Sequence, residues 1–198
     1  MIWYEDEVRL LESKLTTLPP ANNRVVFYGS SSVRLWETIA QDFPQHNTLN
    51  LGFGGSTLAA CGWFFERLLP PAQPASVMFY AGDNDLGDGR HPEEVLLFFV
   101  ALMHKMHQHL PGVPLTFLSI KVSPARLNIH NDIYRTNELI RAETANRPNC
   151  QFIDMTTPLL DPQSGVPRRA YFQPDGLHLS PAGYAAWRDV LLPKQVQI

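Results

Sequence analysis

A serine, a histidine and an aspartate of this 198-residue chain occur where they could support acyl transfer. Ser31 directly follows an apolar run, and Asp175 and His178 lie late in the chain within the string DGLH. A serine hydroxyl is a weak nucleophile that needs a base; histidine can act as that base, and a carboxylate can hold the histidine in the required tautomer. These residue types therefore predict a nucleophile at Ser31, a base at His178 and an orienting carboxylate at Asp175.

Two other segments carry hydrogen-bond donors that such a reaction requires. One is glycine-rich, NLGFGGS at residues 50–56, and the other is GDND at residues 82–85. The tetrahedral intermediate of acyl transfer needs donors aimed at its oxyanion. A backbone N–H in a glycine turn and the side-chain amide of Asn84 can both donate. The N–H of Ser31, at a predicted strand-to-helix turn, can point toward a bound anion as well.

Each of these patterns also has a plainer interpretation. A serine after a strand is most often a helix cap, and Gly-x-Asn-Asp can be an Asx-turn. Ser30 and Ser32 flank Ser31, so the register of the nucleophile is open by one residue. A second Asp-x-x-His string occurs at Asp88–His91. The catalytic interpretation is favoured because the four segments occur in order, each after its own predicted strand.

The elements that must position these residues are predicted from five short apolar runs, at Arg24–Tyr28, Thr48–Leu51, Ser76–Ala81, Leu115–Ile120 and Gln151–Asp154. Such runs are typical of strands buried on both faces. Helical patterns follow at residues 92–109, 131–146 and 181–191. Alternating strands and helices predict a parallel sheet covered on both faces. Ligands bind at the carboxyl ends of such strands, so the candidate residues should meet at one edge.

Two further segments have distinct patterns. Tyr4, Val8, Leu11, Leu15 and Leu18 form an apolar stripe that predicts a first helix, ended by the proline pair at 19–20. This stripe either packs on the domain or forms the seam of a homodimer. Residues 155–174 are rich in proline, and an irregular segment this long predicts a functional loop, here a pocket wall. No linker divides residues 1–198, which predicts one domain, with residues 1–20 as its N-terminal helix.

Composition narrows the function classes. The net charge is −3, and the absence of a basic run argues against nucleic acid or an anionic membrane as partner. No apolar run is long enough for a bilayer, and the first residues lack the pattern of a secretory signal, which predicts a soluble, cytoplasmic protein. Cys61 and Cys150 lie in no paired motif, so we expect neither a disulfide nor a metal site, and no cofactor.

Taken together, the four blocks resemble the SGNH hydrolases, also called the GDSL-type esterase/lipase family. VFYGSSS at residues 26–32 is similar to the nucleophile block and places Ser31 as the serine. Residues 50–57 are similar to the second block, with Gly55 as an oxyanion donor, and residues 82–85 to the third, with Asn84 as another. Residues 175–178 are similar to the last block, which completes a triad with Asp175 and His178.

The resemblance runs from about residue 24 to residue 184. It implies a three-layer, flavodoxin-like α/β fold whose five parallel strands lie in the order 2-1-3-4-5. It also implies ester hydrolysis without a metal. The sequence departs from the family pattern at Ser30, where an acidic residue is usual, and at Ser56, where aspartate is common.

From these observations we predict a serine hydrolase that cleaves small acyl esters through an acyl-enzyme intermediate. Two alternatives remain open at this point. One is an acyltransferase that uses the same triad with a hydroxyl acceptor in place of water. The other is a non-catalytic binding module on the same fold.

Overall fold

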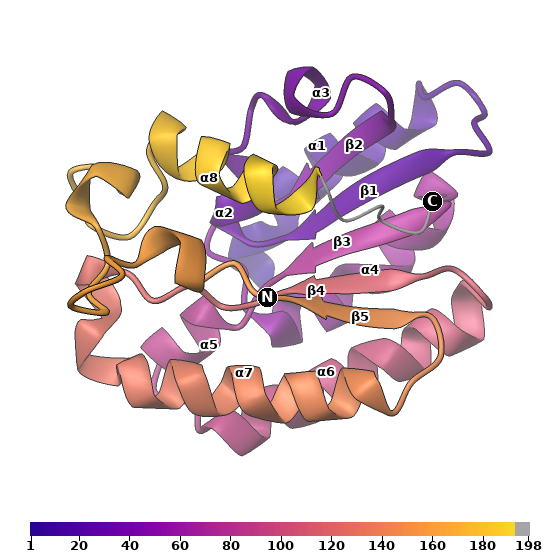
Figure 1. Ribbon diagram of the computed structural model, residues 1–198. Helices are drawn as coiled ribbons and strands as arrows, with labels where there is room; N and C mark the ends of the chain where they lie inside the picture. Colours follow the sequence, from indigo (N-terminus) through magenta and orange to yellow (C-terminus); the bar gives the residue numbers. More distant parts are fainter. Residues whose placement is uncertain (193–198) are drawn as a thin grey trace.

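Five parallel strands form the centre of the molecule in the computed structural model, which describes residues 1–192. They are β1 (Arg24–Gly29), β2 (Asn47–Gly52), β3 (Ser76–Tyr80), β4 (Leu115–Leu118) and β5 (Cys150–Ile153). Their spatial order is β2-β1-β3-β4-β5, which confirms the predicted fold class. All five arrowheads point to the left in Figure 1, so the carboxyl ends share one edge of the sheet.

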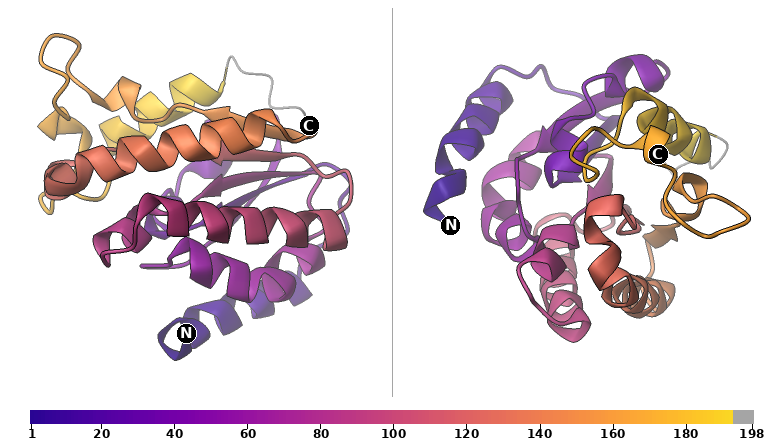
Figure 2. Two further views of the ribbon diagram at one scale, coloured as in Figure 1. Left: turned by 90° about the horizontal axis from the view of Figure 1, so that it is seen from below. Right: turned by 90° about the vertical axis from the view of Figure 1, so that its left-hand side faces the viewer.

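Helices cover both faces of the sheet, and Figure 2 shows α1, α4 and α6 on the side opposite α8. In chain order the helical elements are η1 (Ile2–Tyr4), α1 (Glu5–Thr16), α2 (Ser31–Arg34), α3 (Ile39–Asp42), α4 (Leu58–Ala72), α5 (Asp83–Gly87), α6 (Pro92–His109), η2 (Pro124–Ile129), α7 (His130–Ala145), η3 (Thr157–Leu159), η4 (Arg169–Tyr171) and α8 (Pro181–Leu191), with η marking short 3₁₀ segments.

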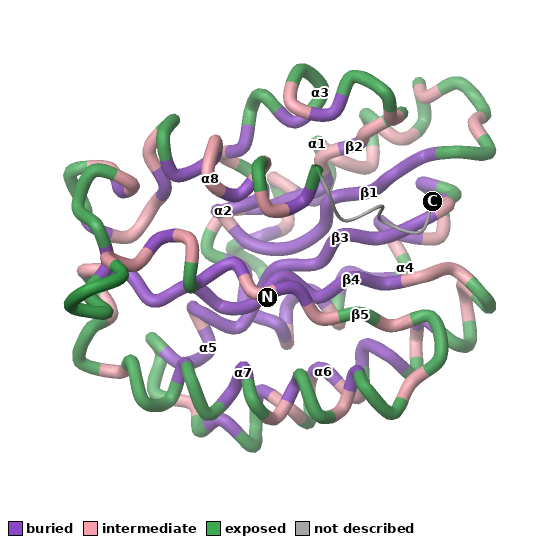
Figure 3. The backbone as a smooth tube through the Cα atoms, viewed as in Figure 1, coloured by how far each residue is buried: buried purple, intermediate pink, exposed green. Residues whose placement is uncertain are grey.

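Two hydrophobic clusters lie on opposite sides of the sheet because side chains alternate along a strand. On β1, Val26 and Tyr28 pack with the residues of α1, α4 and α6. Val25 and Phe27 pack instead with α2, α3 and α8. Every residue of β1 is buried, as expected for a central strand of a parallel sheet. Figure 3 shows β1 in the purple that marks buried residues.

The longest element absent from the predictions is α4. Its sequence, LAACGWFFERLLPPA, is apolar at most positions and has only two charged residues, Glu66 and Arg67, so the polar stripe that reveals an amphipathic helix is weak. The reason is its place in the fold, because α4 packs against α1, α6 and the sheet, while its remaining side, with Trp63 and Glu66, is exposed. The predicted fourth strand was also too long by two residues, since β4 ends at Leu118 rather than Ile120.

The apolar stripe of the first helix packs on the domain, as the first of the two alternatives predicts. Tyr4 and Val8 are buried in the cluster that includes α4, and Arg67 of α4 pairs with Glu5 and Glu12 of α1. The helix ends at Thr16, before the predicted proline stop. Within residues 1–192, no helix is long and apolar enough to cross a membrane.

Candidate active site

The turn that presents Ser31 is determined by Gly29 at the end of β1. Gly29 has φ +139°, and a Cβ atom built there would lie 1.8 Å from the carbonyl oxygen of Tyr80. Only glycine therefore allows β1 to end this close to β3. The N–H of Ser30 donates to the same carbonyl at 2.9 Å, and Ser31 then begins the short helix α2. Ser31 thus lies at the carboxyl end of an inner strand, where its position was predicted.

A chain of two hydrogen bonds joins Ser31, His178 and Asp175. The Oγ atom of Ser31 lies 3.0 Å from Nε2 of His178, although the two residues are 147 positions apart in the sequence. Nδ1 of the same ring lies 2.6 Å from Oδ2 of Asp175. In this arrangement the carboxylate accepts from Nδ1–H, which leaves Nε2 free to accept a proton from the serine.

The segment that carries Asp175 and His178 is held by main-chain contacts. The N–H of Gln173 donates to the carbonyl of His178 at 2.8 Å, which closes the turn around Asp175. The N–H of Ala125 donates to the carbonyl of Gly176 at 3.0 Å. The guanidinium of Arg169 donates to the carbonyls of Gln173 and Pro174. Residues of the proline-rich segment 155–174 thus anchor the turn that carries the candidate base. Their role as a pocket wall stays a prediction.

The carboxyl group of Asp175 is strongly acidic in this setting. Burial disfavours its charge, but hydrogen bonds from the His178 ring and from the backbone N–H groups of Leu177 and His178 outweigh that effect and lower its pKa to about 2. Asp175 is therefore an anion at any pH at which the protein would work, as an orienting carboxylate must be.

The candidate oxyanion donors lie on the three turns that follow β1, β2 and β3. The Asn84 amide nitrogen donates one hydrogen to the carbonyl of Ser56 at 3.1 Å, so its second hydrogen remains available. The Ser56 hydroxyl donates to the carbonyl of Gly29 at 3.1 Å. These two bonds connect the turn after β3, the glycine-rich turn after β2 and the end of β1.

Asp85 connects the turn after β3 to the start of α4. Its side chain is fully buried and accepts from the N–H of Leu58 at 2.6 Å, at the start of α4. Burial raises the pKa of Asp85, and the backbone donors at the start of α4 oppose that rise. Asp85 thus orders the segment between Gly55 and α4 next to Asn84.

The backbone N–H groups of Ser31 and Gly55 have no hydrogen-bond acceptor among residues 1–192. Gly55 adopts φ +67°, and its carbonyl accepts from the Tyr4 hydroxyl at 2.9 Å. An N–H that is not used within the protein can serve a bound ligand, so both groups remain candidates for the donor role predicted for them.

The second Asp-x-x-His string has a structural role. His91 is the N-cap of α6, and its N–H donates to the Glu94 carboxylate at 2.8 Å. In the described part of the chain no hydrogen bond or ion pair joins Asp88 to His91. Of the two strings, only Asp175–His178 contacts Ser31.

One polar cluster beside Ser31 was not predicted. Lys121 is buried after β4 and bonds to Ser32 and Asp83, which are the sequence neighbours of Ser31 and Asn84. A lysine directly after an apolar run was the signal that could have revealed it.

Cys61 and Cys150 are free thiols, and residues 1–192 contain no cluster of three or more His, Cys, Asp or Glu side chains placed to hold a metal.

Comparison with solved structures supports the fold. A GDSL-like lipase from Bacteroides thetaiotaomicron superposes with a TM-score of 0.78, at 17% identity over 94% of this chain and 95% of that one. The OSK domain of Drosophila Oskar superposes with a TM-score of 0.67, at 16% identity over 85% and 86% of the two chains. At such identities the likeness concerns the fold alone.

Sequence comparison extends over most of the chain. The platelet-activating factor acetylhydrolase IB subunit alpha1 of Pongo abelii is 28% identical over 166 residues, which are 81% of this chain and 70% of the relative. The model of the GDSL-like Lipase/Acylhydrolase family matches residues 25–186, a range that contains all the candidate residues described above. The chain therefore belongs to the GDSL-like lipase/acylhydrolase family.

Proposed function

We propose that the protein is a serine ester hydrolase in which Ser31, His178 and Asp175 form the catalytic triad. The observation that carries this proposal is the continuous hydrogen-bonded chain from Ser31 Oγ through the His178 ring to the Asp175 carboxylate, with distances of 3.0 and 2.6 Å. Both distances allow direct proton transfer and tautomer control. The proposal treats residues 1–198 as one catalytic domain.

In the first half of the reaction Ser31 Oγ attacks the acyl carbon while Nε2 of His178 takes the hydroxyl proton. The bond from the acyl carbon to the alcohol oxygen then breaks, and His178 returns the proton to the leaving alcohol. In the second half His178 deprotonates a water molecule, which attacks the acyl carbon. The bond from that carbon to Ser31 Oγ then breaks, His178 returns the proton to Oγ, and the acid is released. Asp175 remains an anion throughout and stabilises the imidazolium that forms in each half.

The negative charge of the tetrahedral intermediate would be held by three donors, the N–H groups of Ser31 and Gly55 and the free hydrogen of the Asn84 amide. Two observations support this assignment: neither backbone N–H has a partner within residues 1–192, and Asn84 is oriented by its bond to the Ser56 carbonyl. Donors that are already oriented need no reorganisation when the charge develops, which is why such sites accelerate acyl transfer.

The substrate class we propose is small acyl esters. The relative from Pongo abelii is named as an acetylhydrolase, so a short acyl group is the first to test. One fold can host many functions, so the fold alone is no argument for activity, and the proposal depends on the triad. An acyltransferase would use the same groups, and we include it in the test.

The test is a series of p-nitrophenyl esters of increasing acyl length, assayed with and without added alcohols. We expect hydrolysis in water that is lost in the Ser31→Ala variant and is fastest with short acyl groups. Product that forms only when an alcohol acceptor is present would replace hydrolase with acyltransferase. Absence of turnover together with absence of labelling by a fluorophosphonate would instead favour a binding module.

For the oxyanion we expect Asn84→Ala to lower kcat about a hundredfold to a thousandfold, because loss of one preorganised donor has this effect in serine hydrolases. KM should change little, since the donor acts in the transition state. The matched control is Asn146→Ala at the end of α7, whose amide also donates to a backbone carbonyl, that of Ala142 at 2.9 Å. Steady-state kinetics on both variants check this, and a change confined to KM would contradict the assignment.

A further inference from the structure

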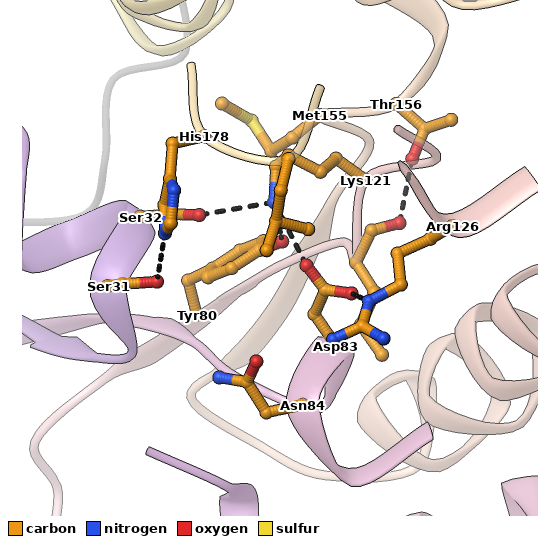
Figure 4. A network of polar contacts seen from close by, with 12 residues as sticks. Ser31, Ser32, Tyr80, Asp83, Asn84, Lys121, Arg126, Met155, Thr156 and His178 are labelled. Atoms are coloured by element: carbon orange, nitrogen blue, oxygen red, sulfur yellow. Dashed lines mark hydrogen bonds and ion pairs between the residues drawn. The ribbon is translucent and has the colours of Figure 1, made fainter. Parts of the chain in front are cut away.

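A buried ammonium group lies beside the proposed nucleophile. Lys121 follows β4 by three residues, and its side chain is only 1% exposed. Its Nζ atom bonds to Ser32 Oγ at 3.2 Å, to the Tyr80 hydroxyl at 3.1 Å and to Asp83 Oδ2 at 3.0 Å. Figure 4 shows Nζ at the centre of these three groups, with the Ser31–His178 pair on one side and Asn84 on another.

The ammonium is charged. Burial by itself lowers the pKa of a lysine, but the Asp83 carboxylate and the Tyr80 hydroxyl outweigh that effect and hold the pKa of Lys121 above its ordinary value. The Arg126 guanidinium lies on the other oxygen of Asp83, with Nε 3.6 Å from Oδ1. One anion thus lies between two cations in a largely dry environment.

Two simple explanations of this lysine fail. A buried ion pair contributes little net stability compared with well-packed apolar residues, so stability alone does not account for it. A serine–lysine catalytic pair is excluded as well, because Ser32 is 1% exposed and cannot reach a substrate. A protonated lysine also cannot act as a base.

What the ammonium does is connect two elements of the site. Ser32 is the second residue of α2, directly after Ser31, and its carbonyl also accepts from the Tyr184 hydroxyl at 3.0 Å. Asp83 is the first residue of α5, directly before Asn84. The bonds of Lys121 therefore run from the neighbour of the nucleophile to the neighbour of the oxyanion donor.

We propose that Lys121 is a positioning residue that sets the Ser31 hydroxyl and the Asn84 amide at their working separation through Ser32 and Asp83. This inference rests on the proposed hydrolase function. The reaction requires the nucleophile and the donor to address the same carbonyl group, and a misplacement of about 1 Å in such a site can cost about a hundredfold in rate. A rigid, charged link between the two turns limits that misplacement.

The first test is Lys121→Met, which keeps an unbranched side chain one atom shorter than lysine and removes the charge and all three N–H donors. We expect kcat to fall about tenfold to a hundredfold, with KM changed less than about threefold, because geometry of the transition state is lost rather than binding. Active sites are counted by fluorophosphonate titration, so a smaller folded fraction does not enter kcat. The matched control is Lys105→Met, a lysine of α6 paired with Glu66 on the surface, which should leave kcat unchanged.

A double-mutant cycle with Asn84→Ala separates positioning from general weakening of the structure. If Lys121 acts by placing Ser31 against Asn84, its loss should cost less than about threefold once the amide is gone, because coupled residues are non-additive. The same full factor in both backgrounds would overturn the proposal, as would an unchanged kcat per active site in Lys121→Met. If that variant does not fold, Ser32→Ala replaces it in the cycle, because it removes one of the three bonds and leaves Lys121 paired with Asp83.

The proposed function and this inference fail in different ways. If the wild-type protein shows no turnover that depends on Ser31, the hydrolase proposal is wrong and the cycle has no basis. If turnover depends on Ser31 but the effects of Lys121→Met and Asn84→Ala multiply, only the positioning role is wrong.

Discussion

Ser31→Ala is expected to lose ester turnover by roughly a millionfold in kcat, because removal of the nucleophile of a serine triad leaves only binding and oxyanion stabilisation. The same variant should not react with a fluorophosphonate, since it lacks the one serine hydroxyl that is bonded to the candidate base within residues 1–192. Intact-protein mass spectrometry measures the labelling, and a circular-dichroism spectrum equal to that of the wild type shows that the variant is folded.

Ser30→Ala and Ser32→Ala are the matched controls, because both residues are buried neighbours of Ser31. Ser30 is 2% exposed and Ser32 1% exposed, and neither hydroxyl contacts His178 within residues 1–192. We expect both variants to be labelled to completion, even where the positioning role of Lys121 makes Ser32→Ala slower. Complete labelling of Ser31→Ala together with none of Ser32→Ala would move the nucleophile by one residue.

His178→Ala should lose nearly all turnover, by about the same factor as Ser31→Ala, because the two residues act as one unit. Without the ring, Ser31 Oγ loses its partner at 3.0 Å, His178 Nε2, and the described part of the chain offers no other base bonded to it. Single-turnover assays on the most reactive ester of the series measure the residual rate.

His91→Ala is the control for His178→Ala and should retain most of the activity. His91 caps α6 through backbone contacts, so we expect a modest loss of stability and an unchanged pH profile. The reverse result, with His91 essential and His178 dispensable, would transfer the base to the turn after β3.

The acidity of Asp175 gives an independent check on its role as the orienting carboxylate. Its pKa is about 2, so the carboxylate stays charged at higher pH. Protonation of Asp175 should therefore not limit turnover well above that pH, and a pH profile of kcat/KM measures this.

The strands, the last helix and the candidate triad were predictable because their signals are local. The run VVFY at residues 25–28 is apolar at every position, which is typical of a strand buried on both faces, and α8 covers the predicted residues 181–191. Ser31, Asn84 and His178 each follow a strand or its connecting loop, so parallel topology brings them to one edge. The strand order itself came from the resemblance of the four blocks to a known family.

Tertiary structure alone decided the rest, because each remaining feature depends on contacts between distant segments. The hydrogen bond between His178 and Ser31 joins residues that are 147 positions apart, so its geometry is set by packing and not by local pattern. Helix α4 is apolar at most positions because α1, α6 and the sheet cover three of its sides. The position of Lys121 directly after an apolar run is visible in the sequence, but only the tertiary structure shows that it is a buried cation bonded to Ser32 and Asp83. The local sequence pattern determines which secondary structure a segment can form. Which groups pair with a buried charge depends on how distant segments pack, and this only the tertiary structure decides.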